Sequence, residues 1–383
     1  MIKNFLKTIF TKSPIYIYGC GKRGKEFASI LKDFDANIIC FFDSDVNKIG
    51  QKYLGIPVCK WAGEKVDGVI AVSPINSKDV FDFLFNSGNE VYSTEDVDSL
   101  KSILSYIDYK KSGYNSLHQL SHFYSPYPDI NFCTQYEQLQ NDEILDIDLK
   151  ISNQINLLSE FKNLYSSLPS WGGGLMGGKG YRYYYPNNVF EIDDALIYHC
   201  FIRTFKPKKI IEIGSGFSSA VALDTNEYYF DNSIQLSFIE PYPMRLKKLI
   251  KLSDNINLNE CSLQDADKKI FKTLEKNDIL FVDSTHVSKR DSDVNIIFFE
   301  ILPKLCPGVI IHFHDIFSKF EYPMEWTRRG DTWTEDYLLR AFLMNNNNYE
   351  IIFFNSLMAN KLEEDYPYPS CHPGGSLWIR KVR

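Results

Sequence analysis

The chain has 383 residues, 44% of them hydrophobic and 24% charged, which is the composition of a globular protein with room for two or three domains. Its formal net charge of −7 argues against nucleic-acid binding as the main role, because neutralising phosphates needs clustered Lys and Arg side chains. No apolar run approaches the ~18 residues of a membrane span, so we expect none.

The cysteines and the N-terminal segment bear on the compartment. The 8 Cys residues are scattered and form no C-x-x-C pair, which argues against a zinc ribbon or a redox motif. The segment before Lys12 has too short an apolar core for a signal peptide and lacks a small-residue cleavage site. We therefore expect a cytoplasmic protein in a reducing environment.

The first hundred residues contain a complete glycine fingerprint. A strand at 15–18 is followed by G-x-G-x-x-G at Gly19, Gly21 and Gly24, and then by a helix. The next strand, at 37–42, ends at Asp43, which lies 19 residues after the last glycine. An acid at this place holds a ribose hydroxyl in dinucleotide-binding folds.

Further elements complete a small doubly wound unit over residues 1–100: a strand at 66–72, a helix at 78–87 and a strand at 90–92. This pattern resembles the small Rossmann domains found ahead of some sugar acyltransferases and attached to some methyltransferases. The resemblance leaves two alternatives open. The domain binds a nucleotide or nucleotide-sugar, or it is only structural.

Residues 101–185 are predicted to connect this unit to a second one. Apolar residues at helical spacing predict a helix over 144–164. The segment 171–180 is rich in glycine and is flanked by Trp and Tyr, whereas a plain linker is usually polar. We interpret it as a lid or substrate loop, with a flexible linker as the alternative.

A second glycine turn follows an apolar strand at 210–213. The strand carries one acid, Glu212, and breaks into Gly214-Ser215-Gly216 before a helix. Glycines let a ligand approach the backbone, and the start of a helix favours negative charge. The third glycine of a dinucleotide fingerprint is missing, and E-x-G-x-G instead resembles motif I of class I S-adenosylmethionine-dependent methyltransferases.

The resemblance extends through later motifs: F-I-E-P-Y-P, I-L-F-V-D-S-T-H, G-V-I-I-H-F-H-D-I-F and G-G-S-L-W-I-R. It covers residues 186–383 and implies that Glu240 binds the ribose, that Leu263 with Gln264 or Asp265 contacts the adenine, and that Asp283 faces cofactor and substrate. The cofactor residues it implies are Glu212, Gly214, Ser215, Gly216, Glu240, Leu263, Gln264 and Asp283.

Candidate catalytic residues follow two predicted strands. Asp283 and His286 end the strand beginning at residue 278, and His314 and Asp315 end the strand at 308–313. Ligands in open α/β sheets bind outside the carboxyl ends of the strands, so these four side chains should converge. A histidine there can act as the general base.

Two alternatives to a histidine base stay open. Asp283 and Asp315 could bind Mg²⁺, which lowers the pKa of an acceptor hydroxyl, as some branches of the family do. In the other alternative, Asp315 caps the next turn and His314 is a packed aromatic residue. Beyond this strand, Trp326 and Trp333 among charged residues suit a sugar acceptor, although a surface flap would have the same composition.

We therefore predict an α/β protein with two Rossmann-like units, the C-terminal one (186–383) carrying a seven-stranded class I methyltransferase sheet whose last strand is antiparallel. The predicted reaction is methyl transfer from S-adenosylmethionine to a saccharide or nucleotide-linked sugar, as in polysaccharide biosynthesis. One rival is an oxidoreductase or sugar-modifying enzyme that acts through the N-terminal fingerprint. Another is a non-catalytic, nucleotide-sensing scaffold. The oligomeric state stays open, a homo-oligomer included.

Overall fold

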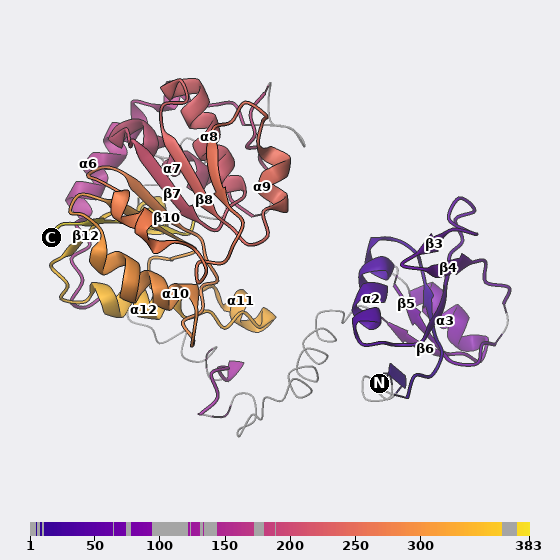
Figure 1. The fold of residues 1–383 in the computed structure, drawn as a ribbon. Coiled ribbons are helices and arrows are strands. Elements are labelled where there is room, and N and C mark those ends of the chain that lie inside the picture. The colour runs from indigo at the N-terminus through magenta and orange to yellow at the C-terminus, as the bar shows by residue number, and fades with distance from the viewer. Residues whose placement is uncertain are drawn as a thin grey trace. The chain divides into compact units, whose positions relative to one another are not determined.

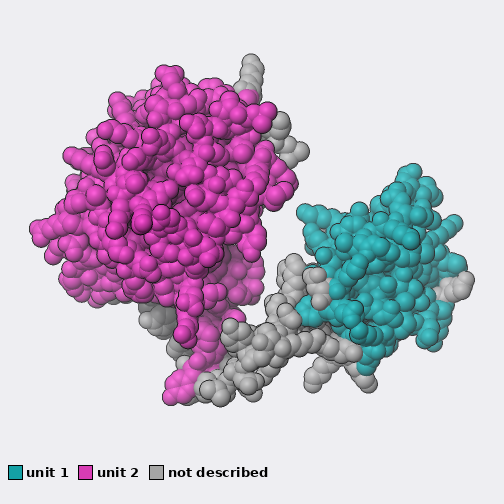
Figure 2. Space-filling view, in the orientation of Figure 1, with its two compact units in different colours: residues 1–119 teal, residues 120–383 magenta. Residues whose placement is uncertain are grey.

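The structure is a computed structural model that describes residues 5, 8–9, 11–63, 65–73, 78–93, 122, 124–130, 133, 144–171, 180–187, 189–361 and 374–383. The chain divides into two compact units, residues 1–119 and 120–383 (Figure 2). Residues 172–179 of the predicted lid at 171–180 and most of the predicted connector lie outside the described residues. In the described part, no helix combines the length and the apolar character needed to cross a membrane.

The first unit is built on a six-stranded sheet with the order β3-β4-β2-β1-β5-β6. Its strands are β1 (Ile15–Tyr18), β2 (Ile38–Phe42), β3 (Lys52–Tyr53), β4 (Ile56–Cys59), β5 (Val69–Val72) and β6 (Glu90–Ser93), and its helices include α2 (Lys22–Asp33) and α3 (Lys78–Asn86). The sequence analysis missed β3 and β4. They are too short for a periodic pattern, and β4 contains Pro57, which favours the interpretation as a loop.

The second unit is built on a seven-stranded sheet with the order β12-β13-β11-β10-β7-β8-β9. Its strands are β7 (Lys209–Ile213), β8 (Gln235–Ile239), β9 (Ile256–Asn259), β10 (Ile279–Val282), β11 (Ile310–His314), β12 (Tyr349–Phe354) and β13 (Ser376–Lys381). Strand β13 lies antiparallel between β11 and β12, so the predicted sheet is confirmed. The strand order reverses between β7 and β10, which is where open α/β sheets bind ligands.

The helices of this unit agree less closely with the prediction. They are α6 (Ile151–Lys162), α7 (Ile192–Phe205), α8 (Phe217–Phe230), α9 (Met244–Leu249), α10 (Asp293–Ile296), α11 (Met324–Arg329), α12 (Glu335–Leu343) and α13 (Asn355–Lys361) (Figure 1). The helix predicted over 144–164 begins only at Ile151, because Lys150 has a left-handed φ of 51°. After α10 the chain forms a π-helical turn, η3 (Ile297–Ile301), and then a 3₁₀ turn, η4 (Leu302–Lys304), which contains Pro303.

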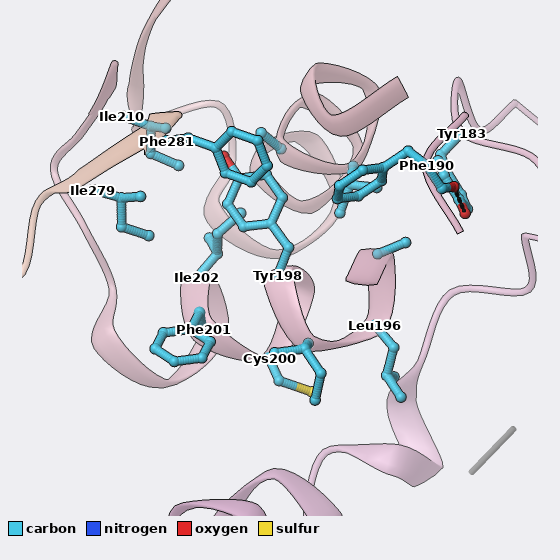
Figure 3. Close-up of a cluster of buried hydrophobic side chains, with 14 of the residues drawn as sticks. Tyr183, Phe190, Leu196, Tyr198, Cys200, Phe201, Ile202, Ile210, Ile279 and Phe281 are labelled. Atoms are coloured by element: carbon cyan, nitrogen blue, oxygen red, sulfur yellow. Dashed lines mark hydrogen bonds between the residues drawn. The ribbon is translucent and has the colours of Figure 1, made fainter. Parts of the chain in front are cut away.

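Both faces of the second sheet are covered by apolar side chains. Helix α7 is buried almost all round, and Figure 3 shows its Tyr198 and Phe201 in one cluster with Phe281 of β10. The Phe201 ring stacks on Trp378 of β13 at 3.8 Å between centroids. Strands buried on both faces are typical of parallel sheets. A ligand therefore finds its place at the carboxyl edge of the sheet.

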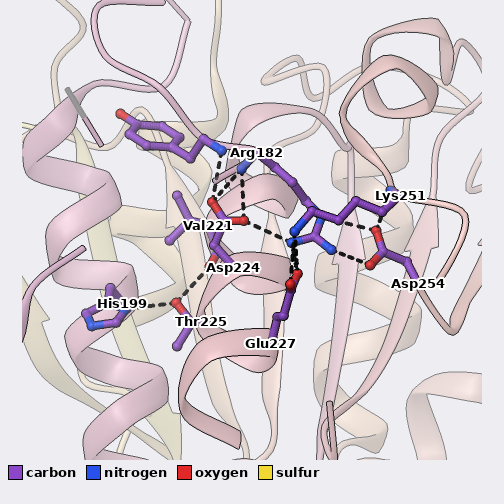
Figure 4. A network of polar contacts seen from close by, with 9 residues as sticks. Arg182, His199, Val221, Asp224, Thr225, Glu227, Lys251 and Asp254 are labelled. Carbon is purple, nitrogen blue, oxygen red and sulfur yellow. Dashed lines mark hydrogen bonds and ion pairs between the residues drawn. The ribbon is translucent and has the colours of Figure 1, made fainter. Parts of the chain in front are cut away.

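A buried ion-pair network ties the segment at 180–185 to α8 (Figure 4). Arg182 pairs with Asp224 at 2.9 Å and with Glu227 at 2.7 Å, and it binds Asp254 through two nitrogens. The backbone N–H groups of Arg182 and Tyr183 also donate to Asp224. Because a buried charge is tolerated only with partners, this network fixes the chain that follows the glycine-rich segment onto α8.

Candidate active site

The glycine turn between β7 and α8 is pressed against the end of β10. Gly214 has a φ of 79°, and a Cβ atom there would lie 1.7 Å from the carbonyl oxygen of Asp283. The Asp283 N–H in turn donates to the Ile213 carbonyl at 2.9 Å. Glycine is required at 214 for both reasons. The turn and the Asp283 backbone therefore form one surface at the point where the strand order reverses.

Glu212 lies beneath this turn and is fully buried. Its Oε1 accepts hydrogen bonds from the hydroxyls of Ser218 and Ser219 at the start of α8, and the Ser219 hydroxyl also accepts the Gly216 N–H at 3.0 Å. Burial raises the Glu212 pKa to about 8, although the two hydroxyls favour the charged form. This acid therefore shapes the turn from below.

Glu240 follows β8 and lies beside the same turn. Its Oε2 accepts the Ser215 N–H at 3.0 Å, and its Oε1 accepts the Tyr242 N–H at 2.7 Å. A carboxylate offers about four acceptor positions, so it can still accept hydroxyls from a ligand. The structure thus brings Glu240, Ser215, Gly214 and Gly216 together.

The residues predicted to contact the adenine are already engaged within the protein. Leu263 is buried in the apolar cluster that includes Ile239 and Val282. The Gln264 amide donates to the Asp291 carbonyl at 2.6 Å. Asp265 accepts the Ser262 hydroxyl at 2.7 Å. Leu263 therefore supports the floor of this region from inside the core.

Four titratable side chains gather at the carboxyl ends of β10 and β11. Nε2 of His286 lies 3.5 Å from Oδ1 of Asp283 and 3.7 Å from Oδ2 of Asp315. Nε2 of His314 lies 3.5 Å from Oδ1 of Asp315. The side chains of Asp283 and Asp315 are 31% and 21% exposed, whereas both histidines are buried. The carboxylates therefore face the solvent, with the imidazoles behind and between them.

Two of these four residues have strained backbones. Asp315 and His286 have backbone φ values of 55° and 58°, in the left-handed region that residues other than glycine rarely adopt. The residue after Asp315 is held by the segment that precedes β13, because the Ile316 N–H donates to the Gly375 carbonyl at 3.2 Å. His286 is held from α12, where the Thr334 N–H donates to its carbonyl at 2.9 Å. Strain that persists in this way is a feature of functional sites.

The charges in the cluster determine its protonation. Burial raises the pKa of Asp283, but His314 and His286 offset this and leave the pKa below its usual value. Burial lowers the pKa of His286, but Asp283 and Glu335 raise it well above the usual value. For Asp315, burial prevails over both histidines and raises the pKa. Asp283 and His286 therefore stabilise each other's charged forms.

Sequence reasoning missed Glu335, the first residue of α12. Its side chain is 1% exposed, and its Oε2 lies 2.9 Å from Nδ1 of His286. The Trp333 ring packs against the same imidazole at 4.5 Å between centroids. Glu335 and His286 are 49 positions apart and belong to no shared motif, so only the folded chain shows their contact.

A pocket of about 600 Å³ opens beside this cluster. Its lining includes Glu321, Tyr322, Asp331, Trp333 and Tyr337, which combine aromatic rings with carboxylates. Trp326 packs on Trp333 at 5.2 Å and extends the aromatic cluster. The volume lies within the range of small-molecule sites. Because Trp333 touches both the pocket and His286, the pocket adjoins the catalytic candidates.

The cluster does not fit Mg²⁺. That ion prefers octahedral oxygen ligands, whereas the imidazole of His286 occupies the position between the carboxylates of Asp283 and Asp315. Over the described residues, no three His, Cys, Asp or Glu side chains are grouped so that they could hold a metal ion.

The N-terminal glycine turn has a similar construction. A Cβ atom on Gly24 would lie 1.9 Å from the Gly19 carbonyl, whereas one on Gly21 would meet nothing within 4 Å. Oδ2 of Asp43 accepts the Cys20 N–H at 2.7 Å and lies 3.3 Å from Nζ of Lys48. The acid predicted to hold a ribose is thus buried and hydrogen-bonded to the turn itself.

Comparisons with known proteins place this chain among methyltransferases. A family model described as a methyltransferase domain matches residues 211–316, which run from β7 to just beyond Asp315. An uncharacterized protein of Archaeoglobus fulgidus is 38% identical over 162 residues, which make up 41% of this chain and 73% of that protein.

Among solved structures, the chain is similar to the SAH-bound methyltransferase PaMTH1 of Podospora anserina, with 16% identity and a TM-score of 0.35, covering 70% of this chain and 100% of the other. It is also similar to the plantazolicin methyltransferase BpumL in complex with SAH, with 15% identity and a TM-score of 0.33, covering 49% of this chain and 81% of the other.

Proposed function

The chain belongs to the class I S-adenosylmethionine-dependent methyltransferases, and we propose that it methylates a hydroxyl of a saccharide or nucleotide-linked sugar. The observation that carries this proposal is the position of the 600 Å³ pocket beside His286. Aromatic rings offer flat apolar surfaces to a sugar ring, and carboxylates accept hydrogen bonds from its hydroxyls. The pocket combines both through Trp333, Tyr322, Glu321 and Asp331.

For the cofactor, we propose the surface formed by Gly214, Ser215, Gly216 and Glu240. Glu240 accepts hydrogen bonds there and keeps acceptor capacity for ribose hydroxyls. The cofactor supplies an electrophilic methyl group, and its transfer to oxygen leaves S-adenosylhomocysteine. For that transfer the acceptor hydroxyl must lose its proton, and the histidines beside Asp283 are the groups suited to take it.

Calorimetric titration with S-adenosylmethionine tests the cofactor site. We expect saturable binding by the wild type and a Kd about 10 to 100 times higher for Glu240→Ala, which removes a charged acceptor. Glu300→Ala is the matched control, because Glu300 is an exposed carboxylate of η3 outside this surface, and it should bind like the wild type. A wild type that does not bind S-adenosylmethionine would overturn the proposal.

The acceptor is tested with a radiolabelled methyl group and a panel of free sugars, nucleotide-linked sugars, catechols and short peptides. We expect label in the sugar fraction, released as a methyl ether that is stable to mild base. Binding of the cofactor together with label only in catechols or peptides would retain the methyltransferase activity and reject the saccharide acceptor.

A further inference from the structure

We infer that Glu335 is the positioning residue of a Glu335–His286 pair in which Nε2 of His286 takes the proton of the acceptor hydroxyl without a metal ion. The inference rests on the proposed function and goes beyond it. It names the base, assigns a role to a residue of α12, and excludes activation of the acceptor by Mg²⁺.

The side chains of Glu335 and His286 are in direct contact. Glu335 is buried, and its Oε2 lies at hydrogen-bond distance from Nδ1 of His286. A buried carboxylate is costly without a partner, so the contact holds a proton on Nδ1. This choice of tautomer leaves Nε2 as the nitrogen that can accept a proton from a substrate.

Backbone hydrogen bonds between the start of α12 and His286 support this contact. The N–H groups of Thr334 and Glu335 both donate to the His286 carbonyl, at 2.9 and 3.1 Å. The Thr334 hydroxyl accepts the Ser288 N–H at 2.9 Å. These bonds hold His286 at its left-handed φ of 58°. The start of α12 and the segment after β10 therefore form one rigid unit that orients the imidazole.

Nε2 of His286 points toward two carboxylates. It faces Oδ1 of Asp283 at 3.5 Å and Oδ2 of Asp315 at 3.7 Å, and both carboxylates are partly exposed. Trp333, which packs on the imidazole, lines the pocket. Trp333 therefore connects the pocket to the imidazole, and a hydroxyl bound at the Trp333 end of the pocket is the one that Nε2 would serve.

The imidazole of His286 is surrounded by negative charge. The His286 imidazole faces three carboxylates, Asp283, Asp315 and Glu335, which together raise its pKa well above the usual value. When neutral His286 takes the proton of the acceptor, the imidazolium that forms lies beside Asp283 and Asp315, whose carboxylates stabilise its charge. In the reaction, the acceptor oxygen forms a bond to the methyl carbon, the carbon–sulfur bond breaks, and the hydroxyl proton moves to Nε2.

The experiment compares Glu335→Gln and Glu335→Asp with the control Asp336→Asn, which changes a buried carboxylate one residue further along α12. We expect Glu335→Gln to lower kcat about 10²- to 10⁴-fold, as loss of a histidine-orienting carboxylate does in other enzymes, with Kd for S-adenosylmethionine and KM for the acceptor within about twofold. Asp336→Asn should keep the kcat of the wild type.

The pH profile separates a positioning role from a merely structural one. Neutral His286 is the active form, so kcat/KM should rise with pH through its pKa. Glu335→Gln removes an anion beside the imidazole and should move this acid limb to lower pH, whereas Glu335→Asp keeps the charge and should leave the limb in place with a reduced plateau. Long-range ¹⁵N spectra should show the Nδ1–H tautomer of neutral His286 in the wild type and its loss in Glu335→Gln.

Three outcomes would overturn the inference. One is a Glu335→Gln variant with the kcat of the wild type. Another is a reduced kcat with an unmoved acid limb in a variant that still binds S-adenosylmethionine. The third is a wild type inactivated by EDTA and restored by Mg²⁺. Failure of the proposed function would look different, because the wild type would then bind no S-adenosylmethionine or transfer no label to sugars.

Discussion

The two glycine turns of the chain can be compared residue by residue. Both follow a buried strand, open a helix and lie beside a second strand that ends in an acid. In both, this acid accepts the N–H of the residue after the first glycine: Asp43 from Cys20 at 2.7 Å, and Glu240 from Ser215 at 3.0 Å. The same local sequence logic has therefore produced the same local structure twice.

The difference lies on the neighbouring strand, across the sheet from the acid. In the first unit, β5 is followed by Ser73, whose hydroxyl donates to the carbonyls of Tyr18 and Gly19. In the second unit, β10 is followed by Asp283, with His286 behind it. A glycine turn provides a place for a ligand, but the chemistry depends on what the adjacent strand brings to that place.

The largest expected effect comes from filling the close approach at each turn. Gly214→Ala would place a Cβ atom 1.7 Å from the Asp283 carbonyl at a φ of 79°. We expect it to lower the free energy of unfolding by about 4 kcal/mol and to raise Kd for S-adenosylmethionine at least ~100-fold. Chemical denaturation and calorimetric titration measure the two effects.

The matched variant is Gly24→Ala, whose Cβ atom would lie 1.9 Å from the Gly19 carbonyl. It should destabilise the first unit and leave Kd for S-adenosylmethionine unchanged. A large change in that Kd would contradict the assignment of the cofactor to the second turn.

The next largest effect concerns the strand residue two positions before the first glycine of each turn, and it is a pH dependence of stability. This residue is Ile17 in the first unit and Glu212 in the second, and both are fully buried. The Glu212 pKa is raised from 4.5 to about 8, so the folded state binds more protons than the unfolded state between these values. The contribution of Glu212 to the free energy of unfolding is therefore greatest below pH 4.5, falls as pH rises toward 8, and changes no further above it.

Glu212→Gln keeps the hydrogen-bond acceptor for Ser218 and Ser219 but removes this titration. Between pH 5 and pH 8 the wild type should lose on the order of 3 kcal/mol relative to the variant. Chemical denaturation at both pH values measures the loss. Equal pH dependence in the two proteins would mean that Glu212 is ionised when folded.

How far the sequence predicts this molecule depends on the range of the interactions. The class I sheet was predictable because each strand and glycine turn leaves a local pattern, from the turn at Gly214 to the antiparallel last strand. The convergence of Asp283, His286, His314 and Asp315 was predictable from topology, since the carboxyl ends of parallel strands meet at one edge.

Other features depend on contacts that local patterns do not encode. Glu335 reaches His286 across 49 residues, and Arg182 finds its partner Asp254 across 72. The short strand pair β3 and β4 has too few residues for a period. Lys150 adopts a left-handed φ, and α6 therefore begins at Ile151 and not at residue 144 as predicted. Tertiary packing decides each of these cases.

The smallest expected effect tests whether the first turn is only structural. The Asp43 side chain is buried and pairs with Lys48, so we expect no saturable NAD(H) binding by the wild type. Asp43→Ala should cost about 1–3 kcal/mol of stability, because it leaves the buried Cys20 N–H without its acceptor. It should leave Kd for S-adenosylmethionine unchanged.

Gly21→Val gives this test its internal control. A Cβ atom at Gly21 meets nothing within 4 Å, and the residue has a φ of −88°, so we expect a change in stability of less than about 0.5 kcal/mol. Steric loss of fold therefore cannot explain a loss of binding in this variant. If the wild type bound NAD(H) saturably and Gly21→Val abolished that binding at unchanged stability, the first turn would be a second ligand site. The two turns would then differ in the ligand they bind and not in whether they bind one.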